Sequence, residues 1–170
     1  SIGIYSYELF TEYDVDRILR VGTAGGIHPS VQLRDIVLGQ GACTDSNYAA
    51  QYHLPGTFAP IASFALLEQA AAAARAAKIP VHIGNLLSSD VFYAEQNTFP
   101  QWQRMGVLAV EMEAAGLYLN AARTGKQALC LATISDLPLT GTATSAEERQ
   151  TTFRSMIQVA LDTAVRAAAS

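Results

Sequence analysis

Three short segments of this 170-residue chain place charged or hydroxyl side chains beside apolar runs, where they could do chemistry. The first is RVGTAGG, Arg20–Gly26, in which an arginine near the end of an apolar run precedes three glycines. Glycines let backbone N–H groups turn toward a small anion, and Arg20 with the Thr23 hydroxyl could bind its oxygens. The segment is therefore a candidate phosphate site. The alternative, which the spacing leaves equally open, is a turn in which Arg20 pairs with a structural carboxylate.

The second segment is VEMEAAG, Val110–Gly116. If residues 110–113 are extended, Glu111 and Glu113 share one face of the strand. Ionised carboxylates only accept hydrogen bonds, so two of them suit a pair of sugar hydroxyls. The alternative is that both begin the next helix, where the helix dipole favours negative charge. For isolated carboxylates this alternative is the more frequent one.

The third segment is Ser135–Asp136, which follows a strand that is otherwise apolar. Ligands of α/β proteins bind beyond the carboxyl ends of the strands. A carboxylic acid beside an apolar core can keep its proton and act as a general acid, although a strand-end Asx turn is the plain alternative. Arg149 stands in the first turn of the predicted last helix, where a cation opposes the dipole. An arginine at this unfavourable position weakly indicates a functional role. The alternative is an ordinary surface arginine.

Strands and helices must alternate to position these segments, which predicts the α/β class with a largely parallel sheet. We expect strands at 17–22, 35–41, 81–87, 106–112 and 127–134, and helices at 2–13, 60–78 and 114–123. A last helix should begin at Ser145, because Ser145 and Glu148 have the spacing of a capping box. A loop is expected at 43–58 and another at 137–144. No repeat or linker divides the chain, so residues 1–170 are expected to form one domain.

Composition excludes several classes of protein. Hydrophobic residues make up 50% and charged residues only 15%, which excludes a disordered tail and indicates surface that is covered in an oligomer. The net charge of -4 does not indicate the basic surface that is typical of a nucleic-acid-binding protein. No apolar run is long enough to span a membrane. Cys43 and Cys130 form no close pair, as is typical of reduced cysteines in a cytoplasmic protein.

Other candidate residues carry less weight. The three histidines, His28, His53 and His82, lack metal-ligand spacing. Ser88 and Ser89 have no matching histidine that would indicate a hydrolytic triad. Phe92 and Tyr93 could stack on a flat ring, but such aromatic pairs are more often part of a core.

Taken together, six ordered motifs resemble the bacterial, hexameric type of purine nucleoside phosphorylase over essentially the whole chain. They are RVGTAGG, GACTDS (Gly41–Ser46), SSDVFY (Ser88–Tyr93), VEMEAAGLY (Val110–Tyr118), ISD (Ile134–Asp136) and AEERQTTF (Ala146–Phe153). The resemblance implies a three-layer α/β/α sandwich around a mixed, largely parallel sheet, and a trimer of dimers. It also implies reversible phosphorolysis of purine (deoxy)ribonucleosides to free base and (deoxy)ribose 1-phosphate. Inorganic phosphate would be the co-substrate, without a metal or organic cofactor.

The resemblance also implies roles for individual residues. The phosphate site would contain Arg20, Val21, Gly22 and Thr23. The nucleoside site would contain Phe92, Val110, Glu111, Met112, Glu113, Ser135 and Asp136. Within it, Glu113 would hold the ribose hydroxyls and Phe92 would line the base pocket. Asp136 would protonate purine N7, and Arg149 would move toward Asp136 as the site closes.

The sequence also departs from the family. Its members carry an N-terminal stretch, preceding the position of Ser1, that begins the sheet and supplies a glycine and an arginine to the phosphate site. It also lends a histidine and an arginine to a neighbouring subunit. We therefore expect a partial chain with an unpaired sheet edge and with weak or no activity alone. The segment LPLTGTAT at 137–144 is also less polar and less charged than the family's.

Three other functions stay open. A uridine phosphorylase belongs to the same superfamily, but would read its pyrimidine with a glutamine and an arginine rather than with Ser135 and Asp136. A nucleosidase acting on methylthioadenosine or adenosylhomocysteine shares the aspartate but uses water, so it does not need Arg20. A truncated chain could also be a non-catalytic assembly subunit.

Overall fold

The computed structural model describes residues 1–145, 148 and 153–169. Its helices and strands, in chain order, are α1 (Ile2–Thr11), β1 (Arg17–Gly26), β2 (Ile36–Thr44), the 3-10 helix η1 (Tyr48–Tyr52), α2 (Phe64–Ala77), β3 (His82–Ser88), α3 (Phe99–Arg104), β4 (Ala109–Glu111), α4 (Ala114–Thr124), β5 (Gln127–Leu137), β6 (Thr142–Ala143) and α6 (Arg154–Ala168). None of the helices it describes is long and apolar enough to cross a membrane.

The strands form one mixed sheet that closes on itself. Its order is β1-β4-β3-β2-β5-β6, and β5 also pairs with β1. The longest ladders, β1 with β5 and β2 with β3, are parallel. The antiparallel ladders of β1 with β4, β2 with β5 and β5 with β6 are shorter. The predicted α/β class with a mixed, largely parallel sheet is confirmed.

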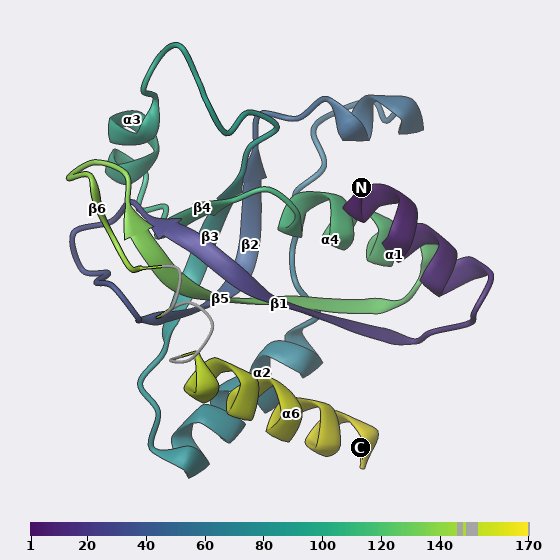
Figure 1. The fold of residues 1–170 in the computed structure, drawn as a ribbon. Coiled ribbons are helices and arrows are strands. Elements are labelled where there is room, and N and C mark those ends of the chain that lie inside the picture. Colours follow the sequence, from purple (N-terminus) through teal and green to yellow (C-terminus); the bar gives the residue numbers. More distant parts are fainter. Residues whose placement is uncertain (146–147, 149–152, 170) are drawn as a thin grey trace.

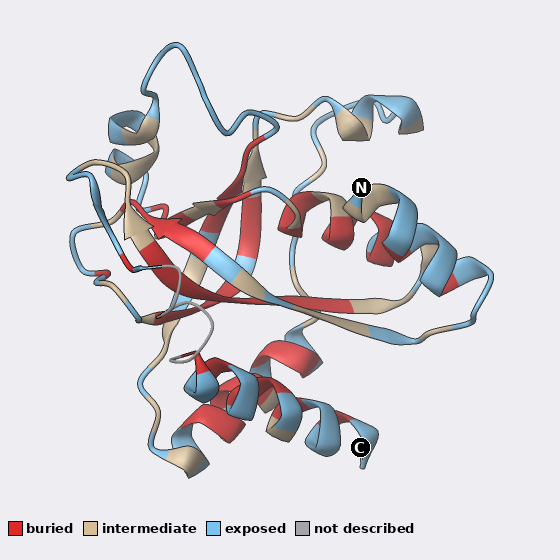
Figure 2. Cartoon of the chain, in the orientation of Figure 1, coloured by how far each residue is buried: buried red, intermediate tan, exposed pale blue. Residues whose placement is uncertain are grey.

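Helices cover both faces of this sheet and make three layers. Figure 1 shows α2 and α6 side by side on one face, and α1 beside α4 on the other. Each face has its own hydrophobic cluster, one around α4 and one around α2 and α6. Figure 2 shows that most of the sheet is buried, while the helices expose their outer sides. The predicted sandwich architecture is therefore present.

The first part of β1 has one unpaired side. Between Arg17 and Ala24, β1 pairs with β5 on one side, while its pairs with β4 are limited to Gly25 and Gly26. Among the strands that the structure describes, none pairs with the other side of the first part of β1. This unpaired side lies along the segment that leads to Arg20.

Several predicted boundaries are wrong. The strand predicted at 106–112 is limited to Ala109–Glu111, and the loop predicted at 43–58 contains η1. Helix α2 begins at Phe64 and not at Pro60, because the chain around Pro60 pairs with β2: Ala42 N–H donates to Pro60 O at 2.9 Å, and Ala62 N–H donates to Gln40 O at 3.0 Å. The predicted loop at 137–144 contains β6, which pairs with the end of β5.

The predicted capping box is confirmed. Ser145 N–H donates to Glu148 Oε2 at 2.9 Å, and Glu148 N–H donates to Ser145 Oγ at 3.1 Å. The helix predicted to begin there is described from Arg154 onward.

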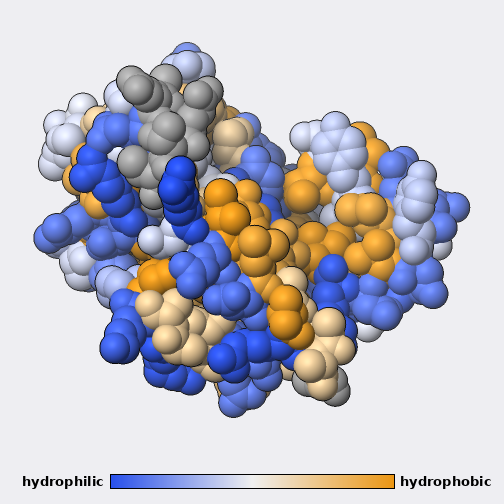
Figure 3. Space-filling model, turned by 60° about the horizontal axis from the view of Figure 1, so that its bottom comes forward, coloured by the Kyte–Doolittle hydropathy of each residue, from blue (hydrophilic) through white to orange (hydrophobic). Residues whose placement is uncertain are grey.

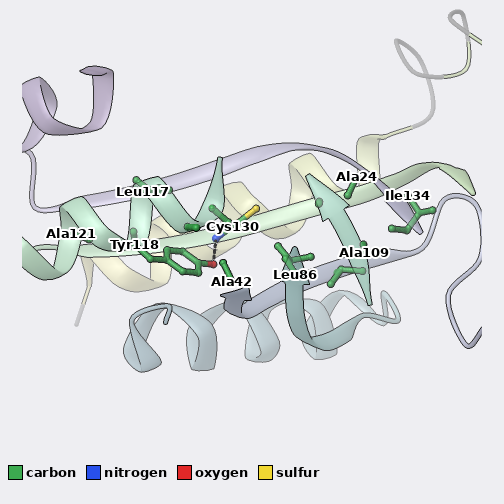
Figure 4. Packing of buried hydrophobic residues seen from close by; sticks show 14 of the residues in the cluster. Ala24, Ala42, Leu86, Ala109, Leu117, Tyr118, Ala121, Cys130 and Ile134 are labelled. Atoms are coloured by element: carbon green, nitrogen blue, oxygen red, sulfur yellow. Dashed lines mark hydrogen bonds between the residues drawn. The ribbon is translucent and has the colours of Figure 1, made fainter. Parts of the chain in front are cut away.

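A buried tyrosine joins α4 to the sheet. The Tyr118 hydroxyl donates to Gly39 O at 2.5 Å. It also accepts from Cys130 N–H at 2.9 Å (Figure 4). Burial raises the pKa of Tyr118 far above its ordinary value, so the hydroxyl keeps its proton. The Tyr118→Phe variant would remove both hydrogen bonds of this buried hydroxyl, and should lose about 1–3 kcal/mol of unfolding free energy. Urea unfolding would measure this. Tyr93→Phe, at a side chain that is 90% exposed, should change stability little; equal losses would contradict the role given to Tyr118.

Candidate active site

The three segments that were singled out as chemically suggestive meet at one cavity. Its volume is about 350 Å³, and it lies between the ends of β1 and β5 and the connection from β4 to α4. The lining residues are Arg20, Thr23, Ala24, Gly25, Ser89, Val91, Phe92, Phe99, Val110, Glu111, Met112, Glu113, Ser135, Asp136 and Pro138. The sheet register explains why the three segments lie close together, because Gly25 of β1 pairs with Val110 on one side and with Asp136 on the other.

Arg20 reaches this cavity from the middle of β1 and is held by carboxylates. Its Nη2 donates to Glu113 Oε2, and its Nε lies 3.7 Å from Glu111 Oε2. The side chain is only 16% exposed. The alternative interpretation of Arg20, pairing with a carboxylate, is therefore what the described structure shows, but the pair lies in the cavity and not in a plain turn.

Gly22 makes room for the Arg20 guanidinium. A Cβ at Gly22 would lie 2.8 Å from Cζ and 2.8 Å from Nη1 of Arg20. Real Cβ atoms do not approach this closely, so the flexible end of the arginine would have to move. This close approach is a physical reason for a glycine two residues after Arg20.

We therefore predict that Gly22→Ala weakens binding of phosphate at this candidate anion site with little loss of stability. Displacement of one charge-assisted hydrogen bond, worth about 1.5 kcal/mol, should weaken phosphate binding about tenfold. Calorimetric titration of inorganic phosphate would measure this. Gly56→Ala is the matched control, since a Cβ there meets nothing within 4 Å. An unchanged phosphate affinity in Gly22→Ala would contradict the assignment.

Glu111 lies at the end of β4 with its side chain fully buried. Its carboxylate accepts from the backbone N–H of Glu113 at 2.9 Å and of Ala114 at 2.9 Å, and from the Ser88 hydroxyl. Burial raises the pKa of Glu111, although these donors and Arg20 oppose the shift. The helix-start alternative therefore describes Glu111. The expected extended stretch through 113 is wrong, because β4 ends at Glu111 and α4 begins at Ala114.

Glu113 occupies the N-cap position of α4 but its side chain makes no cap hydrogen bond. The side chain is 36% exposed, lines the cavity and binds Arg20. It is thus the carboxylate of the pair that a ligand can reach.

Asp136 lies inside β5 and not in a strand-end turn. It pairs with Ala143 of β6, and its Oδ1 accepts from the Ser135 hydroxyl at 2.7 Å. Ser135 is fixed in turn by Thr144, whose N–H and hydroxyl donate to Ser135 O at 2.8 and 2.9 Å. A Cβ at Gly25 would lie 3.1 Å from Asp136 Oδ2, so this glycine also makes room for the acid.

The remaining predicted residues are placed as follows. Phe92 lines the cavity from the loop after β3 and is 74% exposed, so it does not belong to a core. Val21 is 42% exposed and is not among the described lining residues. Arg149 lies outside the described residues.

Sequence reasoning missed six lining residues: Ala24, Gly25, Ser89, Val91, Phe99 and Pro138. Ser89 stands in the SSDVFY motif, and its hydroxyl donates to Asp45 at 2.7 Å. Asp45 belongs to the GACTDS motif, so two quoted motifs meet here. The hydroxyls of Ser88 and Ser89 both donate to carboxylates, an arrangement that differs from a hydrolytic triad.

Comparisons with known proteins show which proteins the chain is similar to. A sequence model described as "Phosphorylase superfamily" matches residues 1–169. A protein of Tolumonas auensis described as "Purine nucleoside phosphorylase DeoD-type" is 47% identical over 163 residues, which are 95% of this chain and 69% of that protein. A protein of Geobacillus sp. with the same description is 46% identical over 166 residues, 98% and 71% of the two chains. A solved structure described as the P knowlesi homolog of P falciparum PNP superposes with a TM-score of 0.84 at 22% identity, covering 99% and 68%, and shares the fold.

Proposed function

The chain belongs to the phosphorylase superfamily, and from this premise we propose that it is a purine nucleoside phosphorylase. The reaction is the reversible cleavage of a purine (deoxy)ribonucleoside by inorganic phosphate, which gives the free base and (deoxy)ribose 1-phosphate. One observation carries the proposal: Arg20, Glu113 and Asp136 line a single cavity, which is of the size of small-molecule sites.

The chemistry of the reaction assigns a role to each of these groups. Cleavage of the C1′–N9 bond leaves positive charge on the sugar and negative charge on the base. Asp136, which the Ser135 hydroxyl orients, would donate a proton to purine N7 and neutralise the leaving base. Phosphate bound at Arg20 and Thr23 would stabilise the sugar cation and then bond to C1′.

The other lining residues position the nucleoside. Glu113 would accept from the ribose hydroxyls, since an ionised carboxylate only accepts. Phe92 would lie against the base, with Val110 and Met112 beside the sugar. Glu111 is fully buried and hydrogen-bonded to backbone N–H groups, so we assign it the positioning of Arg20 and of the start of α4.

Base release from inosine and from adenosine, with and without phosphate, tests this function. We expect release to depend on phosphate and to form pentose 1-phosphate. The criterion is phosphate dependence and not absolute rate. Release without phosphate would indicate a nucleosidase, and preference for uridine would indicate a uridine phosphorylase; either result would contradict the proposal. Absence of release from every substrate would favour the non-catalytic assembly subunit.

We also propose that the protein is a homo-oligomer, and specifically a hexamer built as a trimer of dimers. Ile157, Leu161 and Val165 recur every four residues on α6 and are 50%, 63% and 70% exposed. Figure 3 shows hydrophobic surface gathered in a band on the side of the molecule that carries α2 and α6. Such a band favours association. Sedimentation velocity would measure the oligomeric state.

The remaining proposals concern cofactor and compartment. We propose that phosphorolysis here uses neither a metal ion nor an organic cofactor, so that a chelator should leave the rate unchanged. We place the protein in the cytoplasm, and its two free cysteines, Cys43 and Cys130, suit a reducing compartment.

A further inference from the structure

The side chain proposed to bind phosphate and the side chain proposed to bind the ribose bind each other in this structure. Arg20, the proposed phosphate ligand, donates through Nη2 to Glu113, the proposed ribose ligand. The guanidinium also contacts Glu111, whose Oε2 lies 3.7 Å from Nε, and the Cys130 sulfur, which lies 3.7 Å from Nη1. In this arrangement one donor of Arg20 and one oxygen of Glu113 bind each other and not the substrates assigned to them.

We infer that Glu113 competes with phosphate for Arg20, and that the pentose releases this contact. The inference rests on the proposed function and adds a coupling between its two substrates. When sugar hydroxyls donate to Glu113, its carboxylate turns to them and the Arg20 guanidinium becomes available to phosphate. By linkage, phosphate then strengthens nucleoside binding by the same factor by which the nucleoside strengthens phosphate binding.

The charges around the cavity favour competition over cooperation. Among its lining residues that the structure describes, Arg20 is the single cation, and the two acidic side chains beside it are Glu111 and Glu113. Glu111 is fully buried and engaged by backbone N–H groups, so it stays in place. Glu113 is 36% exposed, so it can leave the guanidinium. Phosphate that arrives before the pentose meets a guanidinium already neutralised and a like charge beside it.

A different role for Glu113 predicts the opposite change in phosphate affinity when Glu113 is removed. If Glu113 oriented Arg20 toward phosphate, as a positioning residue does, its removal would weaken phosphate binding. If it competes for Arg20, its removal strengthens phosphate binding. The affinity for phosphate alone therefore separates the two roles.

The test is calorimetric titration of inorganic phosphate, without nucleoside, into the parent chain, Glu113→Gln and Glu113→Ala. Both variants should bind phosphate about 5- to 150-fold more tightly than the parent, the usual range of coupling between sites. Asp136→Asn is the matched control, because it removes a carboxylate of the same cavity that binds Ser135 and forms no ion pair with Arg20 in the described structure. Circular dichroism and thermal melting would verify that each variant is folded.

Each outcome decides the inference. Tighter binding in both Glu113 variants, without the same gain in Asp136→Asn, supports it. Equal or weaker binding in the Glu113 variants overturns it and leaves the proposed function intact, and so does an equal gain in Asp136→Asn, which would reflect cavity charge alone. Absence of phosphate binding from all proteins overturns both the inference and the proposed function.

Discussion

Asp136→Asn should lower the rate of phosphorolysis by about 10²- to 10⁴-fold, the usual contribution of a general acid. Asparagine has nearly the shape of aspartic acid but no proton that it can transfer to purine N7. The Ser135 hydroxyl can still donate to its side-chain oxygen, as it does to Asp136 Oδ1 at 2.7 Å, so the fold and the nucleoside KM should change little. Single-turnover kinetics on inosine would separate the chemical step from binding.

The control for this variant is Asp162→Asn on α6, which removes the same charge outside the cavity lining. It should leave the rate unchanged. A further check uses a nucleoside whose base is a better leaving group, because its departure needs less protonation. The loss caused by Asp136→Asn should then be smaller. A loss of the same size for both substrates would contradict the role of Asp136 as a proton donor.

Arg20→Met should affect both phosphate use and stability. Loss of the guanidinium from a partly buried charge contact costs about 2 kcal/mol or more in binding, so the KM for phosphate should rise at least about 30-fold. The same change leaves Glu111 buried without its cation, which should cost about 3 kcal/mol of unfolding free energy at neutral pH. Arg17→Met is the control on the same strand, since the exposed Arg17 binds only Gln127 among the hydrogen bonds described for its side chain.

The stability loss should depend on pH with a defined sign. Burial already raises the pKa of Glu111 in the parent chain, and loss of Arg20 would raise it further. A group whose pKa is raised on folding favours the folded state in its protonated form, so its ionisation destabilises the variant as pH rises through the raised pKa. Urea unfolding should therefore show a smaller difference between Arg20→Met and the parent near pH 4 than near pH 8. A difference independent of pH would mean that Glu111 is not the group left unpaired.

Much of the fold could be predicted from the sequence because its signals are local. Apolar runs and caps locate the elements, as with α4, which ends at Gly125 in the left-handed conformation that glycine favours. The element boundaries that the sequence did not predict are set by pairing between segments that are distant in the sequence. The glycines after Arg20 were interpreted as the end of a strand, yet β1 continues to Gly26 because it pairs with both β4 and β5. Helix α2 starts late because the residues before it pair with β2.

The site could be predicted to the level of motifs but not of contacts. Polar residues at the ends of three strands were expected to meet, and Arg20, Glu113 and Asp136 do line one cavity. The sequence did not indicate that Glu111 is buried and Glu113 partly exposed, because this difference depends on where β4 ends and α4 begins. The role of Ser88 depends on the position of the end of β3 beside the junction of β4 and α4. The Ser88 hydroxyl donates to Glu111 and accepts from Ala115 N–H at 2.8 Å.

The central claim is that one cavity binds the base at Asp136, the sugar at Glu113 and the anion at Arg20. A crystal structure of the chain with inosine and sulfate, an unreactive substitute for phosphate, tests it most directly. We predict purine N7 within hydrogen-bond distance of Asp136, ribose hydroxyls on Glu113, and sulfate on Arg20 and Thr23, with the Arg20–Glu113 contact broken. Nucleoside bound elsewhere, or bound in this cavity with its sugar away from Glu113 and its base away from Asp136, would contradict the account.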